Sequence, residues 1–188
     1  MKWLPAFAAA ATVAIALPAG GAITVIGDNA AAVCARAVAL GLADDDSLRL
    51  CNDAVEHGDL NHHDLVATYV NRGAVLMNRR DYAAADADFE RAIRMEPAAG
   101  EAWMDRGAIA ILQHRFRDGI ADTTKGIALG VEDPAKAYFN RAVAYEGVDD
   151  EKSAYFDYQQ ALTLKPGWDL PRRELLRFSV TVREGGAG

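Results

Sequence analysis

Three of the four histidines lie close together in the sequence and could in principle bind a metal. His57, His62 and His63 fall within seven positions, and Asp64 follows them directly. Imidazole and carboxylate groups are common ligands of transition metals. Their spacing does not follow the His-Glu-x-x-His pattern of a helical zinc site, and polar loops often carry histidine. We therefore expect no metal and no other cofactor, and a metal-binding protein is the least favoured of three functions considered below.

Catalytic motifs are missing from the sequence. It has no Gly-x-Ser-x-Gly nucleophile elbow, no Walker phosphate-binding loop and no dinucleotide-binding glycine pattern in a strand-to-helix setting. The formal net charge is −7, from 20 Lys+Arg and 27 Asp+Glu. Nucleic acids and anionic membranes select basic surfaces, so neither is expected as the main partner. We predict that the chain is not an enzyme and that its partner is a protein or a peptide.

The two cysteines have the spacing of a disulfide that closes a helical hairpin. Cys34 lies in one stretch of helical character, 29–40, and Cys51 lies in another, 46–57. The midpoint between them in the sequence falls inside the turn 41–43, so in an antiparallel hairpin they face one another. A redox pair would need Cys-x-x-Cys spacing, and two thiols alone make a poor zinc site. We therefore predict a Cys34–Cys51 disulfide, which suits an oxidising compartment.

The N-terminus has the pattern of a secretory signal peptide. Lys2 precedes an uncharged apolar run over 4–17, and small residues at Gly20 and Ala22 suit cleavage after residue 22. We expect residues 1–22 to be removed and the chain to be exported, with the bacterial periplasm favoured by composition. The alternative is an uncleaved membrane anchor, although a spanning helix needs roughly 20 apolar residues.

A repeat of 34 residues organises the rest of the chain. Segments that begin at residues 66, 100 and 135 align with one another, with one extra residue in the loop 130–134. An aromatic residue recurs at the fourth position and an arginine at the seventh. The recurring residues are Tyr69, Trp103 and Tyr138, and Arg72, Arg106 and Arg141. A fixed period of this length is the signature of a stacked helical repeat.

The repeated residues closely resemble the tetratricopeptide repeat (TPR) family. The first segment matches the family pattern at Tyr69, Gly73, Leu76, Ala85, Phe89, Ala92 and Pro97. The third matches it at Tyr138, Ala142, Tyr145, Ala154, Tyr158, Ala161 and Pro166. The second keeps Trp103, Gly107 and Ala110 but departs at Gly119, Thr123, Gly126 and Val131. Two interpretations of its glycines stay open: a tolerated weak repeat, or a helix against which something packs closely.

The resemblance implies an all-α fold. We predict a TPR-type α-solenoid of three repeats, with an N-terminal hairpin that carries the cysteines and a C-terminal capping helix. The expected organisation is a signal peptide at 1–22, a degenerate hairpin at 23–63, repeats at 66–99, 100–134 and 135–168, a capping helix at 169–178 and a flexible tail at 179–188.

TPR arrays line a concave face with their first helices, so the resemblance also implies a partner-binding groove. The corresponding positions here are Val70, Asn71, Ala74, Met77, Met104, Asp105, Ala108, Ile111, Phe139, Asn140, Val143 and Glu146. This set is mildly apolar with short polar residues, and it lacks the lysine of the members that clamp a C-terminal carboxylate. The recurring arginines are interpreted as structural, bonding helix ends or acidic neighbours.

The sequence therefore favours a protein-interaction scaffold or adaptor of the cell envelope. Its predicted mechanism is the capture of a peptide or a partner helix in the concave groove. The alternative from another class is a structural module that self-associates by stacking through the ends of its repeats.

Overall fold

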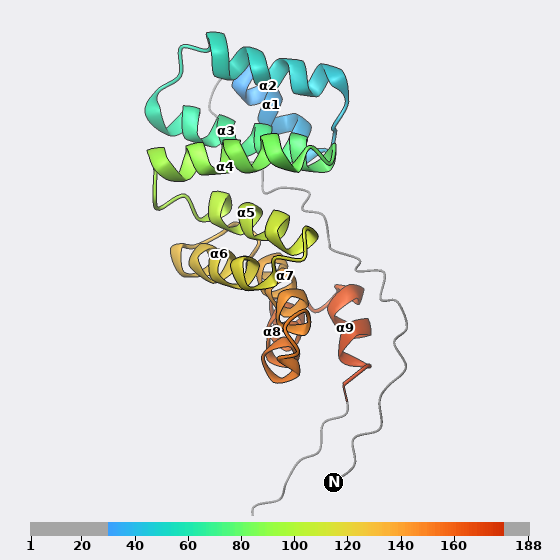
Figure 1. Ribbon diagram of the computed structural model, residues 1–188. Helices are drawn as coiled ribbons and strands as arrows, with labels where there is room; N and C mark the ends of the chain where they lie inside the picture. Colours follow the sequence, from blue (N-terminus) through green and yellow to red (C-terminus); the bar gives the residue numbers. More distant parts are fainter. Residues whose placement is uncertain (1–29, 179–188) are drawn as a thin grey trace, which may run out of the picture.

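The computed structural model describes residues 30–178, and this part of the chain is entirely helical (Figure 1). Its helices are α1 (Ala30–Ala39), α2 (Asp45–His57), α3 (His62–Asn78), α4 (Tyr82–Met95), α5 (Gly100–Leu112), α6 (Phe116–Leu129), α7 (Pro134–Glu146), α8 (Glu151–Leu164) and α9 (Asp169–Leu175). The prediction of an all-α solenoid is confirmed. The expected signal peptide and the tail at 179–188 lie outside the described residues, as does the start of the N-terminal hairpin.

Successive helices pair into antiparallel hairpins that stack in chain order. The pairs are α1–α2, α3–α4, α5–α6 and α7–α8, and each second helix also packs against the first helix of the next hairpin. The stack begins at α1 and α2 and ends at α8 and α9 (Figure 1). One hairpin cannot bury its apolar face alone, so the neighbours complete its core.

Short polar side chains fix where most of these helices begin. Asp44, Asn61, Asp81, Asp133 and Asp150 each accept a hydrogen bond from a backbone N–H in the first turn of the helix that follows. Such caps satisfy donors that have no partner within the helix. They place the first residue of each helix, and therefore the face that it turns to the core.

The turn within each repeat contains a left-handed residue that is not glycine. Arg80, His114 and Asp149 have φ values of 65°, 59° and 61° and occupy the same repeat position. This conformation is uncommon for residues with a side chain and costs on the order of 1 kcal/mol. Its recurrence shows that the turn geometry is set by the packing of the two helices that it joins, and no single residue type is required there.

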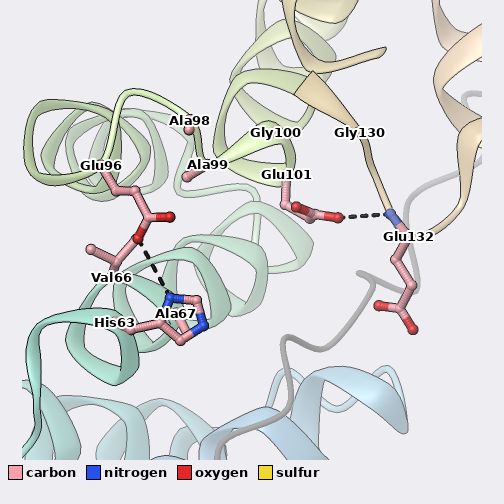
Figure 2. Close-up of a pocket in the computed structure, with 10 residues that line it drawn as sticks. All are labelled: His63, Val66, Ala67, Glu96, Ala98, Ala99, Gly100, Glu101, Gly130 and Glu132. Atoms are coloured by element: carbon pink, nitrogen blue, oxygen red, sulfur yellow. Dashed lines mark hydrogen bonds and ion pairs between the residues drawn. The ribbon is translucent and has the colours of Figure 1, made fainter. Parts of the chain in front are cut away.

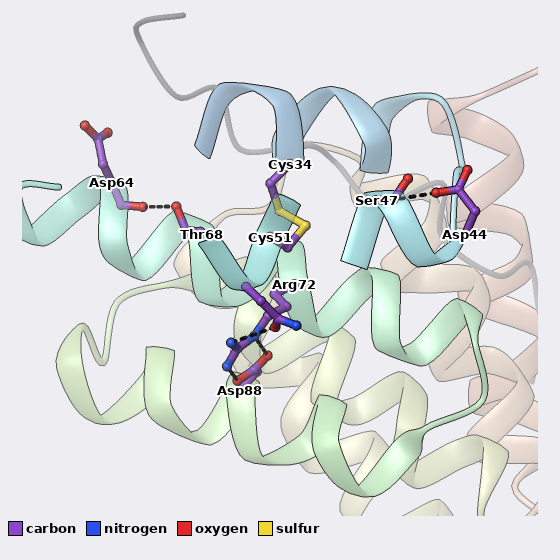
Figure 3. Close-up of a disulfide and its surroundings, with 9 residues drawn as sticks. Cys34, Asp44, Ser47, Cys51, Asp64, Thr68, Arg72 and Asp88 are labelled. Carbon is purple, nitrogen blue, oxygen red and sulfur yellow. Dashed lines mark hydrogen bonds and ion pairs between the residues drawn. A yellow bond between two sulfur atoms is a disulfide. The ribbon is translucent and has the colours of Figure 1, made fainter. Parts of the chain in front are cut away.

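The predicted disulfide between Cys34 and Cys51 is present and joins α1 to α2 (Figure 3). Both cysteines are fully buried, with their Cα atoms 4.9 Å apart. They pack together with Val38, Ala74 and Val75, so the bridge also lies against α3. The hairpin is thereby held to the first repeat by apolar contact as well as closed on itself.

The last helix covers part of the final hairpin. Trp168, at the start of α9, packs on Phe139, and Phe178 lies against Tyr155 and Tyr158. These aromatic contacts seat α9 on α7 and α8, in agreement with the predicted capping helix. Within residues 30–178, no helix is both long and apolar enough to cross a membrane.

Candidate functional site

The expected groove residues lie in the interior of the stack. Ten of the twelve are buried, and two are partly buried, Val143 and Glu146. The buried ten are Val70, Asn71, Ala74, Met77, Met104, Asp105, Ala108, Ile111, Phe139 and Asn140. The first helices contact one another, α1 with α3, α3 with α5 and α5 with α7, so their shared face is used for packing. In this structure these ten side chains therefore pack inside the stack and are not exposed to solvent.

The two partly buried members are also engaged within the chain. Val143 packs in the cluster formed by α7, α8 and α9. Glu146 accepts a 2.5 Å hydrogen bond from the Tyr158 hydroxyl and forms an ion pair of 2.7 Å with Arg177. Glu146 thus ties the C-terminal end of the chain to the last hairpin.

A row of buried polar side chains runs along the first helices. Asn71, Asp105 and Asn140 occupy the same repeat position and are at most 2% exposed. The Oδ1 atoms of Asp105 and Asn140 have no hydrogen-bond partner among the residues described. Burial, and to a lesser degree the negative charge of Glu101, raises the pKa of Asp105 to about 7, although Lys136 acts in the opposite direction. Asp105 is therefore the one member whose charge depends on pH near neutrality.

The recurring arginines pair with aspartates sixteen residues later, which confirms their structural interpretation. Each guanidinium makes two hydrogen bonds of 2.7–2.9 Å to one carboxylate, and each also lies over the aromatic ring of the fourth position. Figure 3 shows the first pair. The pairs are Arg72–Asp88, Arg106–Asp122 and Arg141–Asp157. A planar fork of donors matches a carboxylate in this way, so each pair joins the two helices of its repeat.

An open pocket of about 320 Å³ lies where the first two repeats meet (Figure 2). Val66 and Ala67 of α3 form one wall, and Gly100 and Glu101 at the start of α5 form another. These are the first two positions of their repeats, one turn before the buried groove positions. Val66, Ala67 and Gly100 are buried, so the accessible lining of the pocket comes mainly from Glu101 and from the loops 96–99 and 130–132.

The pocket has an acidic rim. Glu96, Glu101 and Glu132 line it, and His63 is the only residue with a basic side chain among those that do. The Nδ1 atom of His63 is 3.5 Å from a carboxylate oxygen of Glu96. Glu101 accepts a 2.7 Å hydrogen bond from the backbone N–H of Glu132. Carboxylates at such a rim can accept hydrogen bonds from a lysine or arginine side chain.

Of these residues, sequence reasoning singled out only His63. The glutamates come from the end of α4, the start of α5 and the loop after α6, so only the stacking of hairpins brings them together. The only feature of the sequence that could have indicated these glutamates is that each lies near a boundary between repeats. As for metal binding, no group of three or more His, Cys, Asp or Glu residues within 30–178 is arranged to hold an ion.

The described repeats match known proteins in two ways. A family model described as tetratricopeptide repeat matches residues 66–98 and 135–167. No curated protein matches the chain in sequence. In the second of the three predicted repeats, the glycine-rich departures noted above coincide with the segment that the family model leaves unmatched.

Similar solved structures include three of MamA. One, residues 41 to the end from Desulfovibrio magneticus RS-1, has a TM-score of 0.62 and 21% identity and covers 80% of this chain and 84% of that one. A MamA RS-1 ArsTM double mutant gives 0.61 and 20%, covering 80% and 83%. A crystal structure of MamA gives 0.61 and 18%, covering 76% and 80%. Identity at this level shows a shared fold. The chain therefore contains tetratricopeptide repeats at residues 66–98 and 135–167 within a fold shared with the MamA structures, and these repeats support a protein-interaction scaffold in general.

Proposed function

We propose that the chain is an adaptor of the cell envelope that captures a segment of a partner protein at the edge of its concave face. The observation that carries the proposal is the acidic pocket between the first two repeats. Its rim at Glu96, Glu101 and Glu132 is accessible, whereas Val66, Ala67 and the side chains deeper on the same face are buried. The captured segment presents a lysine or arginine, because three glutamates surround the opening.

The size and chemistry of the pocket support this choice of ligand. About 320 Å³ accommodates one long side chain with its neighbouring backbone. The accessible methyl groups of Ala98 and Ala99 suit the methylene stem of such a side chain, and the carboxylates of Glu101 and Glu96 suit its charged end. Ion pairs at an accessible rim contribute mainly to specificity and to the rate of association.

Two features support a place in the cell envelope. The Cys34–Cys51 bridge is of the kind that persists in oxidising compartments. The first 22 residues of the sequence have the charge, apolar run and small residues of a secretory signal. An N-terminal sequence beginning at Met1, determined on the protein isolated from the envelope, would contradict cleavage and favour the anchored alternative.

Site-specific cross-linking tests the binding site. A photoreactive amino acid replaces Ala98, which lines the pocket and is exposed, and a matched control replaces Lys125, which is exposed on α6. We expect a partner to cross-link in cells at the first position only. The double substitution Glu101→Lys and Glu132→Lys should abolish that product without changing the circular dichroism spectrum. Equal products at both positions, or a product that survives the charge reversal, would contradict the proposal.

A further inference from the structure

Within residues 30–178, the large hydrophobic side chains that are exposed lie only at the two ends of the stack. Helices α3 to α7 contribute none of them. Those of the first hairpin are Val33, Leu40 and Leu42, and those at the other end are Phe156 and Leu164 of α8 and Leu176, directly after α9. A solenoid that ends in water needs polar outer faces. Here both ends are apolar, which is the property of surfaces that meet another protein.

The comparison among repeats shows that Phe156 is not required by the fold. The same position holds Ala87 in the first repeat and Ala121 in the second, and both alanines are exposed. Phe156 is 55% exposed and replaces a methyl group by an aromatic ring on the outer side of α8. One edge of the ring contacts Tyr155, and more than half of its surface remains in solvent.

A groove of about 540 Å³ lies beside Phe156, between α8 and the end of α9. The corresponding face of α4 and of α6 is exposed in the same way, but it carries Ala87 and Ala121 in place of the aromatic ring. The walls of the groove are apolar at Phe156, Leu162 and Leu175 and polar at Gln159 and Thr163.

The opposite end of the stack presents a helix that fits such a groove. Val33 and Arg36 lie on the exposed face of α1, and Leu40, also exposed, follows its last residue; the three are three and four residues apart. This spacing is that of the anchor residues by which an amphipathic helix enters a groove. Arg36, between the two apolar anchors, can donate hydrogen bonds to side-chain oxygens such as those of Gln159 and Thr163.

The two ends also carry opposite charge. Residues 30–58 contain five acidic residues and two arginines, a net charge of −3. Residues 151–178, which include α8 and α9, contain five basic and four acidic residues, a net charge of +1. Unlike charges on the two surfaces favour contact between an N-terminal end and a C-terminal end, and they oppose contact between two N-terminal ends.

We infer that the groove between α8 and α9 is occupied by α1 of a second copy of this chain, so that molecules associate head to tail. This inference concerns the ends of the stack and does not depend on the acidic pocket. A head-to-tail contact uses two different surfaces, so each added molecule leaves one surface of each kind open. The product is a series of oligomers whose mean mass rises with concentration.

Sedimentation velocity on the full chain as the cell produces it provides the test. The wild-type protein should show a weight-average mass that increases up to roughly 0.5 mM, and the increase should be smaller at 1 M than at 0.1 M salt. Phe156→Ala, which restores the residue of the other repeats, and Leu40→Asp should each remain monomeric. Ala121→Ser, at the matching position of α6, is the control and should behave as the wild type. A wild-type monomer at all concentrations would overturn the inference.

Mixing the variants distinguishes this contact from others. Leu40→Asp keeps an intact groove, and Phe156→Ala keeps an intact α1. An equimolar mixture should therefore form dimers and no larger species, although each variant alone is a monomer. If Leu40→Asp alone still dimerises, the contact joins two C-terminal ends, and the head-to-tail arrangement is wrong. Unchanged thermal unfolding of both variants shows that the loss of association is not a loss of folding.

Discussion

The first and second repeats fill the space between their helices in opposite ways. In the first, the fully buried ring of Phe89 lies over Gly73, where an added Cβ would come within 2.6 Å of the ring. In the second, Thr123 takes the place of that ring, and Gly119 and Gly126 let α6 approach α5 directly. An added Cβ at Gly126 would lie 2.8 Å from the carbonyl oxygen of Gly100. Close packing is kept in both, once by a large side chain and once by backbone approach.

This difference decides between the two interpretations of the second repeat. The glycines lie where α5 and α6 meet: a Cβ at Gly119 would come within 2.5 Å of the Ile111 side chain, and one at Gly126 within 3.0 Å of the Met104 backbone nitrogen. The partner that packs closely is therefore the first helix of the same repeat. Departure from the family pattern marks a different packing solution here, and it does not mark a looser hairpin.

The largest predicted difference in stability is between substitutions of Phe89 in the first repeat and of Thr123 in the second. Phe89→Ala removes a buried ring, and we expect it to lower the free energy of unfolding by about 3–5 kcal/mol. Thr123→Val should instead raise it by up to about 1 kcal/mol, because the Thr123 hydroxyl is buried and has no hydrogen-bond partner among the described residues. Urea denaturation followed by circular dichroism measures both. A large loss in Thr123→Val would show that the second repeat is not packed as described.

A single methyl group should disrupt the second repeat. Gly126→Ala places a Cβ against backbone atoms of α5 that cannot move aside, so we expect a loss of about 1–3 kcal/mol. On helix propensity alone the same change would stabilise by about 1 kcal/mol, so the sign of the effect is informative. Gly167→Ala, whose Cβ would meet nothing within 4 Å, is the matched control and should be nearly neutral. A stabilised Gly126→Ala variant would favour the weak-repeat interpretation.

The polar row gives a pH-dependent difference between the repeats. The pKa of Asp105 is about 7 in the folded chain and about 3.9 in an unfolded one, so the folded state holds the proton more tightly. The tighter binding of this proton stabilises the folded state at low pH. As the pH rises from about 4 to about 7, this stabilisation is lost and the free energy of unfolding falls. Asp105→Asn supplies the residue of the other two repeats, and we expect a gain of about 1–3 kcal/mol at pH 8 and little change at pH 4. Urea unfolding at both pH values measures it, and an equal effect at both would contradict a titrating Asp105.

The smallest predicted differences concern the arginine pairs. Arg72 also donates to Asn52 of α2, and Arg141 to Thr124 of α6, so these two link neighbouring hairpins. Arg106 forms no such third contact within residues 30–178. We expect each Arg→Ala substitution to cost about 1–3 kcal/mol, and Arg106→Ala to cost about 0.5–1 kcal/mol less than the others. Equal losses in the three thermal unfolding profiles would mean that only the pairs within each repeat matter.

Much of the fold could be predicted because the repeat carries its own rules. Recurrence of Tyr69, Trp103 and Tyr138 at a fixed period predicts helical hairpins, and equal distance from a turn predicts the Cys34–Cys51 bridge. The groove residues were predicted from position within a repeat, which says which face a side chain is on. It does not say how closely the next helix approaches that face, and this distance decides whether Val70 or Asn140 is open or buried.

The sequence by itself determined the helices, their pairing, the disulfide and the kind of protein, because each of these depends on residue types at short and regular spacing. The tertiary structure alone decided which surfaces are accessible. Glu96, Glu101 and Glu132 come together only when hairpins stack, and the position of Phe156 faces outward in every repeat because of how its helix packs. Stacking depends on the sum of many contacts between neighbouring repeats. A local sequence pattern therefore does not predict which surfaces remain accessible after stacking.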